Sequence, residues 1–121
     1  MKLSLHHLAL RTSDVSALAA FYTQMLGLEV VRESSPRSVW LGLGEGAVLM
    51  IEARDAGEVP AATGSMELVA FRVDDDAKAA VRRRAAERGC ADGETEFTVY
   101  FRDPDGRRVG VSTYDLEAAI S

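Results

Sequence analysis

Two arginines stand at matching steps of two short segments in which apolar and polar side chains alternate. Arg11 follows His7 by four residues and Arg72 follows Leu68 by the same interval, with an alanine midway in each case. Since successive side chains of a strand point to opposite faces, the members of each trio share one face. A guanidinium donates paired hydrogen bonds to a carboxylate or phosphate, and a small alanine leaves room for a ligand. The spacing therefore indicates an anion-binding site, although strand-end arginines are also often paired with a nearby Asp or Glu.

The chain repeats itself, and the repeat predicts the architecture. Residues 6–14 can be laid over residues 67–75, with an alanine and an arginine at the same steps and helix-starting polar residues at the end. In each half, one alternating strand is followed by one helical pattern and three strand-like segments. The expected helices cover 15–26 and 77–88, and the expected later strands cover 28–33, 38–43, 47–53, 92–94, 96–102 and 107–113. The sequence thus predicts two βαβββ modules of the α+β class.

The helix boundaries have local signals. Ser13 or Asp14 in the first half, and the run 74–76 in the second, can cap the first amide groups of a helix. Gly27 and Gly89 supply the matching stops. We expect a single domain with module one at 3–54, a linker containing Gly and Pro at 55–65, module two at 66–113 and a tail with a short helix at 114–121.

Composition excludes several classes of function. The chain has 121 residues, 47% hydrophobic and 27% charged, which is ordinary for a soluble globular domain. A net charge of −5 argues against a nucleic-acid partner, and the sequence contains no run suited to a membrane span or a secretory signal. Cys90 is the single cysteine, so no intrachain disulfide is possible, and a cytoplasmic location is expected.

Three motifs in order resemble one known family. They are the run from His7 to Leu10, the run 26–31 after the first helix, and the run from Phe101 to Gly106. Together they resemble the vicinal oxygen chelate superfamily, which includes glyoxalases, bleomycin-resistance proteins and extradiol dioxygenases. The resemblance covers Leu5 to about Ser112. It implies a cupped mixed sheet, or half-barrel, a homodimer, and a divalent metal held by one pair of ligands from each module.

The resemblance also assigns the four metal positions. They fall on His7 and Glu52 in module one, and on Leu68 and Gly110 in module two. Imidazole and carboxylate suit Zn, Ni, Fe or Mn, whereas leucine and glycine offer no side-chain ligand. The neighbouring Glu67 should point to the opposite face. We therefore expect an incomplete metal site. The remaining pair either holds one metal with water or substrate, or forms a hydrogen bond without metal.

Alternation and the resemblance together outline a pocket. In glyoxalase-like relatives, the arginine at the position of Arg11 binds the anionic end of the substrate, and Arg72 is its counterpart in the repeat. Met50 shares the face of Glu52, and Arg108 shares that of Gly110. Two aromatic residues of the middle strands, Trp40 and Tyr100, either line this pocket or pack in the core.

Three functions fit these residues. The first is a small-molecule binding protein, like the bleomycin-resistance branch, with an anionic or oxygen-rich ligand. The second is a metal-dependent lyase, isomerase or dioxygenase using His7 and Glu52. The third is catalysis without metal, in which Glu52 is the general base and His7 orients it.

Overall fold

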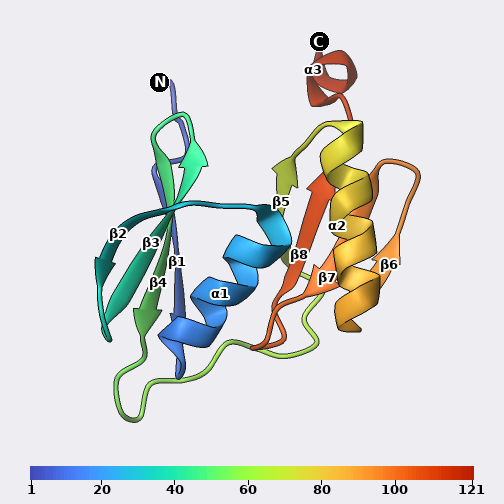
Figure 1. Cartoon of the computed structure of the whole chain (residues 1–121). Helices are drawn as coiled ribbons and strands as arrows, with labels where there is room; N and C mark the ends of the chain where they lie inside the picture. The colour runs from blue at the N-terminus through green and yellow to red at the C-terminus, as the bar shows by residue number, and fades with distance from the viewer. The chain divides into compact units, whose positions relative to one another are not determined.

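The computed structural model describes residues 1–121 and divides the chain into two compact units, Met1–Ala61 and Ala62–Ser121. The boundary falls inside the segment predicted as a linker, which contains neither helix nor strand. Each unit is one βαβββ module, as the repeat predicted (Figure 1). None of the helices is long and apolar enough to cross a membrane.

The first module consists of one helix and a four-stranded sheet. Its elements are β1 (His7–Thr12), α1 (Val15–Leu26), β2 (Val30–Ser34), β3 (Ser38–Gly44) and β4 (Ala47–Ala53). The strand order is β1-β4-β3-β2, and β1 runs parallel to β4 while the other pairs are antiparallel. The outer strand β2 is exposed along its whole length and has an irregularity between Val30 and Arg32.

The second module has the same topology. Its elements are β5 (Leu68–Arg72), α2 (Asp75–Arg88), β6 (Ala91–Glu94), β7 (Thr98–Arg102) and β8 (Arg108–Ser112), followed by the short α3 (Leu116–Ile120). The strand order is β5-β8-β7-β6, with β5 parallel to β8. The strand expected at 96–102 begins at Thr98, because residues 95–97 form the turn from β6 into β7, closed by a hydrogen bond from the Thr95 amide to the Thr98 carbonyl.

Local capping sets the ends of both long helices. Asp14 accepts a hydrogen bond from the Ala17 amide at 3.0 Å, and Asp74 accepts one from the Ala77 amide at 2.8 Å. Gly27 and Gly89 end the helices in the left-handed conformation, with φ of 67° and 68°. The predicted caps are confirmed. The second helix begins two residues earlier than expected, because Asp74 is the residue that caps it.

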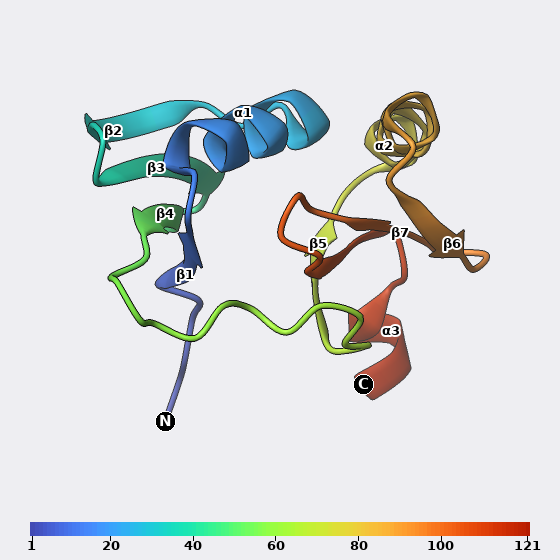
Figure 2. The same cartoon turned by 90° about the horizontal axis from the view of Figure 1, so that it is seen from below.

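The core of each module lies between its helix and one face of its sheet. Figure 2, which looks along the edges of the sheets, shows α1 beside one face of the first sheet and α2 beside one face of the second. The buried apolar side chains are Val15, Leu18, Ala19, Phe21, Tyr22, Met25, Val39, Leu41, Leu49 and Ile51 in the first module, and Val81, Ala85, Val99, Phe101, Val109 and Val111 in the second. Burial of each large aliphatic side chain stabilises the fold by about 1.5–3 kcal/mol. A one-residue slip would expose this set, so the facing of each strand is strongly specified.

The turn between β7 and β8 is held by a buried carboxylate. Asp103 is 4% exposed. Its side chain accepts hydrogen bonds from the amides of Asp105 and Arg107, at 2.9 and 3.1 Å, and from the Arg107 guanidinium at 3.1 Å. Gly106 completes the turn with a φ of 85°, which a side chain would strain. This network fixes where β8 begins.

Candidate functional site

The face of each sheet away from its helix carries the residues singled out from the sequence. We call this the open face. Strand pairing divides it into three rows, each with one residue from each of three neighbouring strands. In the first module these are the arginine rung (Arg11, Glu52, Ser38), the alanine rung (Ala9, Met50, Trp40) and the outer rung (His7, Val48, Gly42). In the second they are the arginine rung (Arg72, Ser112, Thr98), the alanine rung (Ala70, Gly110, Tyr100) and the outer rung (Leu68, Arg108, Arg102).

The rungs change the assignment of the metal positions in the first module. Leu68 lies on the outer rung and Gly110 on the alanine rung, so the equivalent pair in module one is His7 and Met50. Glu52 lies one rung further, opposite Arg11, and corresponds to Ser112. His7 is opposite Val48, four residues along the strand from Glu52, which is about 13 Å. The structure does not bring His7 and Glu52 together, and metal binding through them remains a prediction.

The neighbour that His7 does have is His6. Its Nδ1 lies 2.9 Å from the Nδ1 of His7, and both rings are exposed. His6 precedes β1 and so lies outside the alternation of that strand. The hydrogen bond that His7 was expected to offer Glu52 is made within this histidine pair.

The second module does not fit a metal ligand pair. A side chain at Gly110 would place its Cβ 3.2 Å from Tyr100 Cδ1, 3.3 Å from Thr98 Cγ2 and 3.4 Å from Leu68 Cδ1. The space that a ligating side chain would need is therefore bordered on three sides. Across the chain, no group of three or more His, Cys, Asp and Glu side chains is arranged to hold a metal ion. The residues present do not match the four-ligand centre that the resemblance implies, so no chemistry is derived from one.

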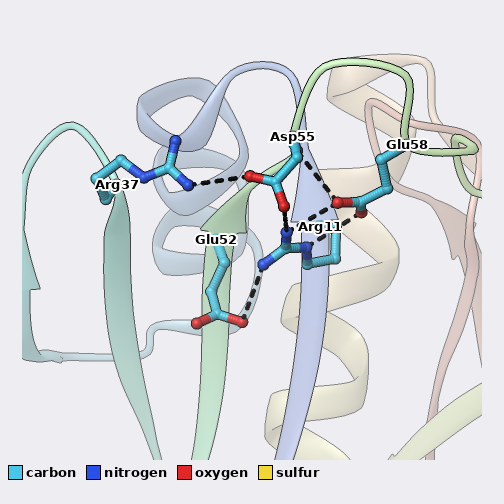
Figure 3. A network of polar contacts seen from close by, with 5 residues as sticks. All are labelled: Arg11, Arg37, Glu52, Asp55 and Glu58. Atoms are coloured by element: carbon cyan, nitrogen blue, oxygen red, sulfur yellow. Dashed lines mark hydrogen bonds and ion pairs between the residues drawn. The ribbon is translucent and has the colours of Figure 1, made fainter.

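Arg11 is surrounded by carboxylates of its own module (Figure 3). Its Nε and Nη2 donate to the two carboxylate oxygens of Glu58 at 3.1 and 2.8 Å, and Nη2 also donates to Asp55 at 3.3 Å. Glu52 lies 3.8 Å from Nη1. Arg37 donates to the other oxygen of Asp55 at 3.3 Å, which extends the network to the turn that precedes β3.

This network decides the role of Arg11. The hydrogen bonds from Arg11, and then from the Asp55 amide, lower the pKa of Glu58 from 4.5 to about 2. The hydrogen bond with Glu58, and then the charges of the surrounding carboxylates, raise the pKa of the Arg11 guanidinium. The paired donors that would grip an external anion are thus already satisfied by Glu58. Of the two interpretations drawn from the sequence, the ion-paired arginine is the one found, and the ligand role expected for Arg11 is not supported.

Arg72 is the opposite case. Its side chain is exposed, and the structure gives the guanidinium no hydrogen bond or ion pair with any other residue of the chain. It borders a cavity of about 340 Å³ on the open face of the second module. The lining residues are Leu68, Ala70, Phe71, Arg72, Thr98, Tyr100, Ser112, Tyr114 and Leu116. This volume is within the range of small-molecule sites, and a mostly apolar wall with a few polar groups is typical of them.

Two hydroxyls lie beside Arg72 on its rung. Thr98 donates to the Ser112 hydroxyl at 2.7 Å, and the Tyr114 amide donates to the same oxygen at 3.2 Å. A contact between two hydroxyls uses only one of their two protons, so the pair of Thr98 and Ser112 keeps one proton to donate. The rung therefore offers two kinds of donor, guanidinium and hydroxyl, and no carboxylate.

Arg108 supports the pocket rather than facing a ligand. Its Nε donates to Asp92 at 2.9 Å, and its guanidinium carbon lies 3.9 Å from the centre of the Tyr100 ring. Arg102 contacts the same Asp92 oxygen at 3.0 Å. These two arginines lower the pKa of Asp92, with the hydrogen bond from Arg108 as the largest cause. The guanidinium of Arg108 is thus already paired with Asp92, and it stacks on the ring of Tyr100.

The aromatic residues of the middle strands lie on the open faces and not in the cores. Trp40 is half-buried beside Met50 on the alanine rung, with the Arg32 guanidinium carbon 4.9 Å from its ring centre. Tyr100 is half-buried and lines the cavity of the second module. Core packing, one of the two interpretations drawn from the sequence, is not found for either residue.

A second hollow, of about 510 Å³, lies on the helix side of the first sheet, between α1 and the turn from β2 to β3. The cation that borders it, Arg37, is already paired with Asp55. We place the candidate site in the second module, where a cavity, a free cation and a row of hydroxyls coincide.

Several residues that shape these sites were not predicted from the sequence. Asp55 and Glu58 lie in the linker, where a carboxylate has no periodic pattern to indicate a partner. Tyr114 had a signal, because it continues the alternation of 108, 110 and 112 beyond the last strand onto the same face.

The chain belongs to the Glyoxalase/Bleomycin resistance protein/Dioxygenase superfamily, whose family model matches residues 4–111. The predicted family and fold class are thereby confirmed. A comparison with curated proteins finds no match.

Several solved structures are similar to this chain over nearly its whole length. Oxidase ChaP-H2 is 25% identical with a TM-score of 0.75, covering 95% of this chain and 96% of that chain. The fosfomycin resistance protein FosX from Listeria monocytogenes is 18% identical with a TM-score of 0.78, covering 99% and 98%. Lactoylglutathione lyase from Agrobacterium tumefaciens is 22% identical with a TM-score of 0.70, covering 92% and 93%. These relatives differ in activity, so they establish the fold and leave the ligand to be argued from the site.

Proposed function

We propose that this chain is a small-molecule binding protein of the superfamily, acting as a homodimer, whose ligand is anionic or oxygen-rich and is held without a four-ligand metal centre. The observation that carries the proposal is the cavity of about 340 Å³ beside the unpaired Arg72. An exposed guanidinium next to an apolar wall combines the two elements of a ligand site, apolar contact area and a group that fixes orientation.

The residues at the four ligand positions support binding without metal. Paired rung by rung, these positions hold His7, Met50, Leu68 and Gly110, of which only the histidine is a usual ligand for Zn, Ni, Fe or Mn. Glu52, the other predicted ligand, faces Arg11. The general-base mechanism is not proposed, because it requires His7 to orient Glu52 and the two lie on different rungs.

Metal analysis of the purified protein tests the first half of the proposal. The protein is exchanged into Zn, Ni, Mn or Fe, freed of loose metal and analysed, with His7→Ala and Glu52→Gln as variants. We expect less than stoichiometric metal in all three proteins. Stoichiometric metal that is lost in both variants would overturn the proposal and establish the metal-dependent lyase, isomerase or dioxygenase in its place.

Binding to the cavity is tested with small ring compounds observed by amide chemical shifts. Benzoate, benzamide and benzyl alcohol are titrated into labelled protein, and Ala70→Leu serves as a variant that fills the cavity at the alanine rung. We expect at least one compound to shift the amides of β5, β7 and β8, and this response to be lost in Ala70→Leu. If none of the three shifts these amides in the native protein, the cavity is not a ligand site.

A further inference from the structure

We infer that the natural ligand of the second module is a ring-bearing monocarboxylic acid, with its carboxylate on the arginine rung and its ring over the alanine rung. This inference rests on the proposed function and specifies the ligand class of the same cavity. It follows from three features of the cavity: its charge, its donors and the spacing of its rungs.

The internal repeat provides the comparison for the charge. Both modules have an arginine at the same place on the open face, but the neighbour on the next strand is Glu52 in the first module and Ser112 in the second. Arg11 receives two more carboxylates, from Asp55 and Glu58. Arg72 receives none, and no Asp or Glu lines its cavity. The exposed guanidinium of Arg72 has no internal partner, so its paired donors are available to the anion of a ligand.

The donors indicate a single carboxylate. Arg72 is the only charged residue that lines the cavity, so a ligand with one negative charge is fully neutralised there and a dianion is not. The guanidinium offers two parallel N–H groups that match the two oxygens of a carboxylate. The hydroxyl pair of Ser112 and Thr98, on the same rung as Arg72, keeps one proton that can be donated to one of those oxygens.

The rung spacing indicates a ring next to that carboxylate. Residues that share a face of a strand lie about 6.6 Å apart, two steps of about 3.3 Å, so the next rung is within reach of a group attached to a carboxylate on Arg72. On the rung next to Arg72, only the methyl group of Ala70 faces the cavity, because Tyr100, Thr98 and Leu68 crowd the space over Gly110. The small side chain of Ala70 leaves room for a flat apolar group.

Three further side chains border the cavity beside Ala70. Tyr100 lies on one side, fixed by Arg108 at 3.9 Å, and Leu68 closes the far end. Tyr114 lines the cavity at the Arg72 end and contacts Phe97, with ring centres 5.2 Å apart and planes at 70°. Aromatic rings held in this way favour a ring as the ligand body, because stacked and edge-on contacts need little further ordering.

The test compares an acid with its uncharged amide. Benzoate, benzamide and phenyl phosphate are titrated into the full chain, and dissociation constants are taken from the amide shifts of β5 and β8. The variant is Arg72→Gln, and the matched control is Arg83→Gln, an exposed arginine of α2 with no partner in the structure. Both substitutions remove one positive charge from the same module, and thermal unfolding checks that both proteins fold.

We expect benzoate to bind at least tenfold more tightly than benzamide, and more tightly than phenyl phosphate. Arg72→Gln should abolish the preference for the acid, while Arg83→Gln keeps it. Equal binding of benzoate and benzamide at the cavity, or a preference that persists in Arg72→Gln, would overturn the acid inference while leaving the binding function intact. Tighter binding of phenyl phosphate would overturn the assignment to a monocarboxylate. Failure of every ring compound to reach the cavity would instead overturn the proposed function.

Discussion

A glutamate in place of Met50, one rung away from Glu52, should create a metal site that the native protein does not have. Two donors bound to one Zn²⁺ are each about 2.1 Å from the ion, so they lie within about 4 Å of each other. His7 and Glu52 are one strand apart, about 4.8 Å, and four residues along it, about 13 Å, which places their Cα atoms about 14 Å apart. Side chains of a strand stand roughly perpendicular to the sheet, so two such chains do not close the remaining 10 Å or so.

Met50 is placed differently. Val48 lies opposite His7 on the neighbouring strand, and Met50 is two residues further along that strand. The Cα atoms of His7 and Met50 are therefore about 8 Å apart on the diagonal. Long side chains on one face of a sheet can bridge this distance. Met50→Glu should therefore bring a carboxylate and an imidazole to one ion. We expect the affinity for Co²⁺ or Zn²⁺ to rise at least tenfold, about 1.4 kcal/mol, over the native protein.

This gain in affinity is measured by metal titration, monitored either by calorimetry or by the absorption of bound Co²⁺. The gain should disappear in the double variant with His7→Ala and be unaffected by adding Glu52→Gln. The reasoning from the rungs is refuted if the native protein already binds the ion as tightly as Met50→Glu does and loses that affinity in Glu52→Gln.

Three further outcomes follow from the structure. Asp103→Ala removes three hydrogen bonds from a buried carboxylate, so urea unfolding should show a loss of about 3–5 kcal/mol, and a loss below about 1 kcal/mol would contradict the role given to this turn. The pKa of Glu58 is lowered from 4.5 to about 2, so its contribution to stability is complete above pH 4.5 and is lost as the pH falls through about 2. Glu58→Gln should therefore flatten the decline of stability over that range in unfolding measured pH by pH, and an unaltered slope would show that the pair with Arg11 does not form in solution. Light scattering should give twice the mass of one chain, whereas a single-chain mass at micromolar concentration would remove the homodimer from the proposal.

The elements of the fold could be predicted because their signals are local. Asp14 and Asp74 cap helices through hydrogen bonds that reach only three residues, and Gly27 and Gly89 stop them through their own conformation. The alternation in each strand likewise predicted which side chains share the open face, since a buried face tolerates no slip.

The register between parallel strands could not be predicted in the same way. A whole helix and two strands separate β1 from β4, so no turn fixes which residue of one lies opposite which residue of the other. The error placed Glu52 beside His7, although Arg11 is its neighbour. The pairing of Arg11 with the linker carboxylates was not predicted for a related reason. An irregular segment has no periodic pattern from which a partner can be inferred.

The contrast between the two arginines has a consequence for how the protein can change. In the first module, the guanidinium of Arg11 links the segment after β4 to β1 through ion pairs with Asp55 and Glu58. In the second module, the corresponding residue, Arg72, makes no such ion pairs. Substitutions that reshape the cavity around Ala70 or Tyr100 therefore leave the ion pairs of Arg11 intact. The second module can change its ligand without loss of these contacts in the first.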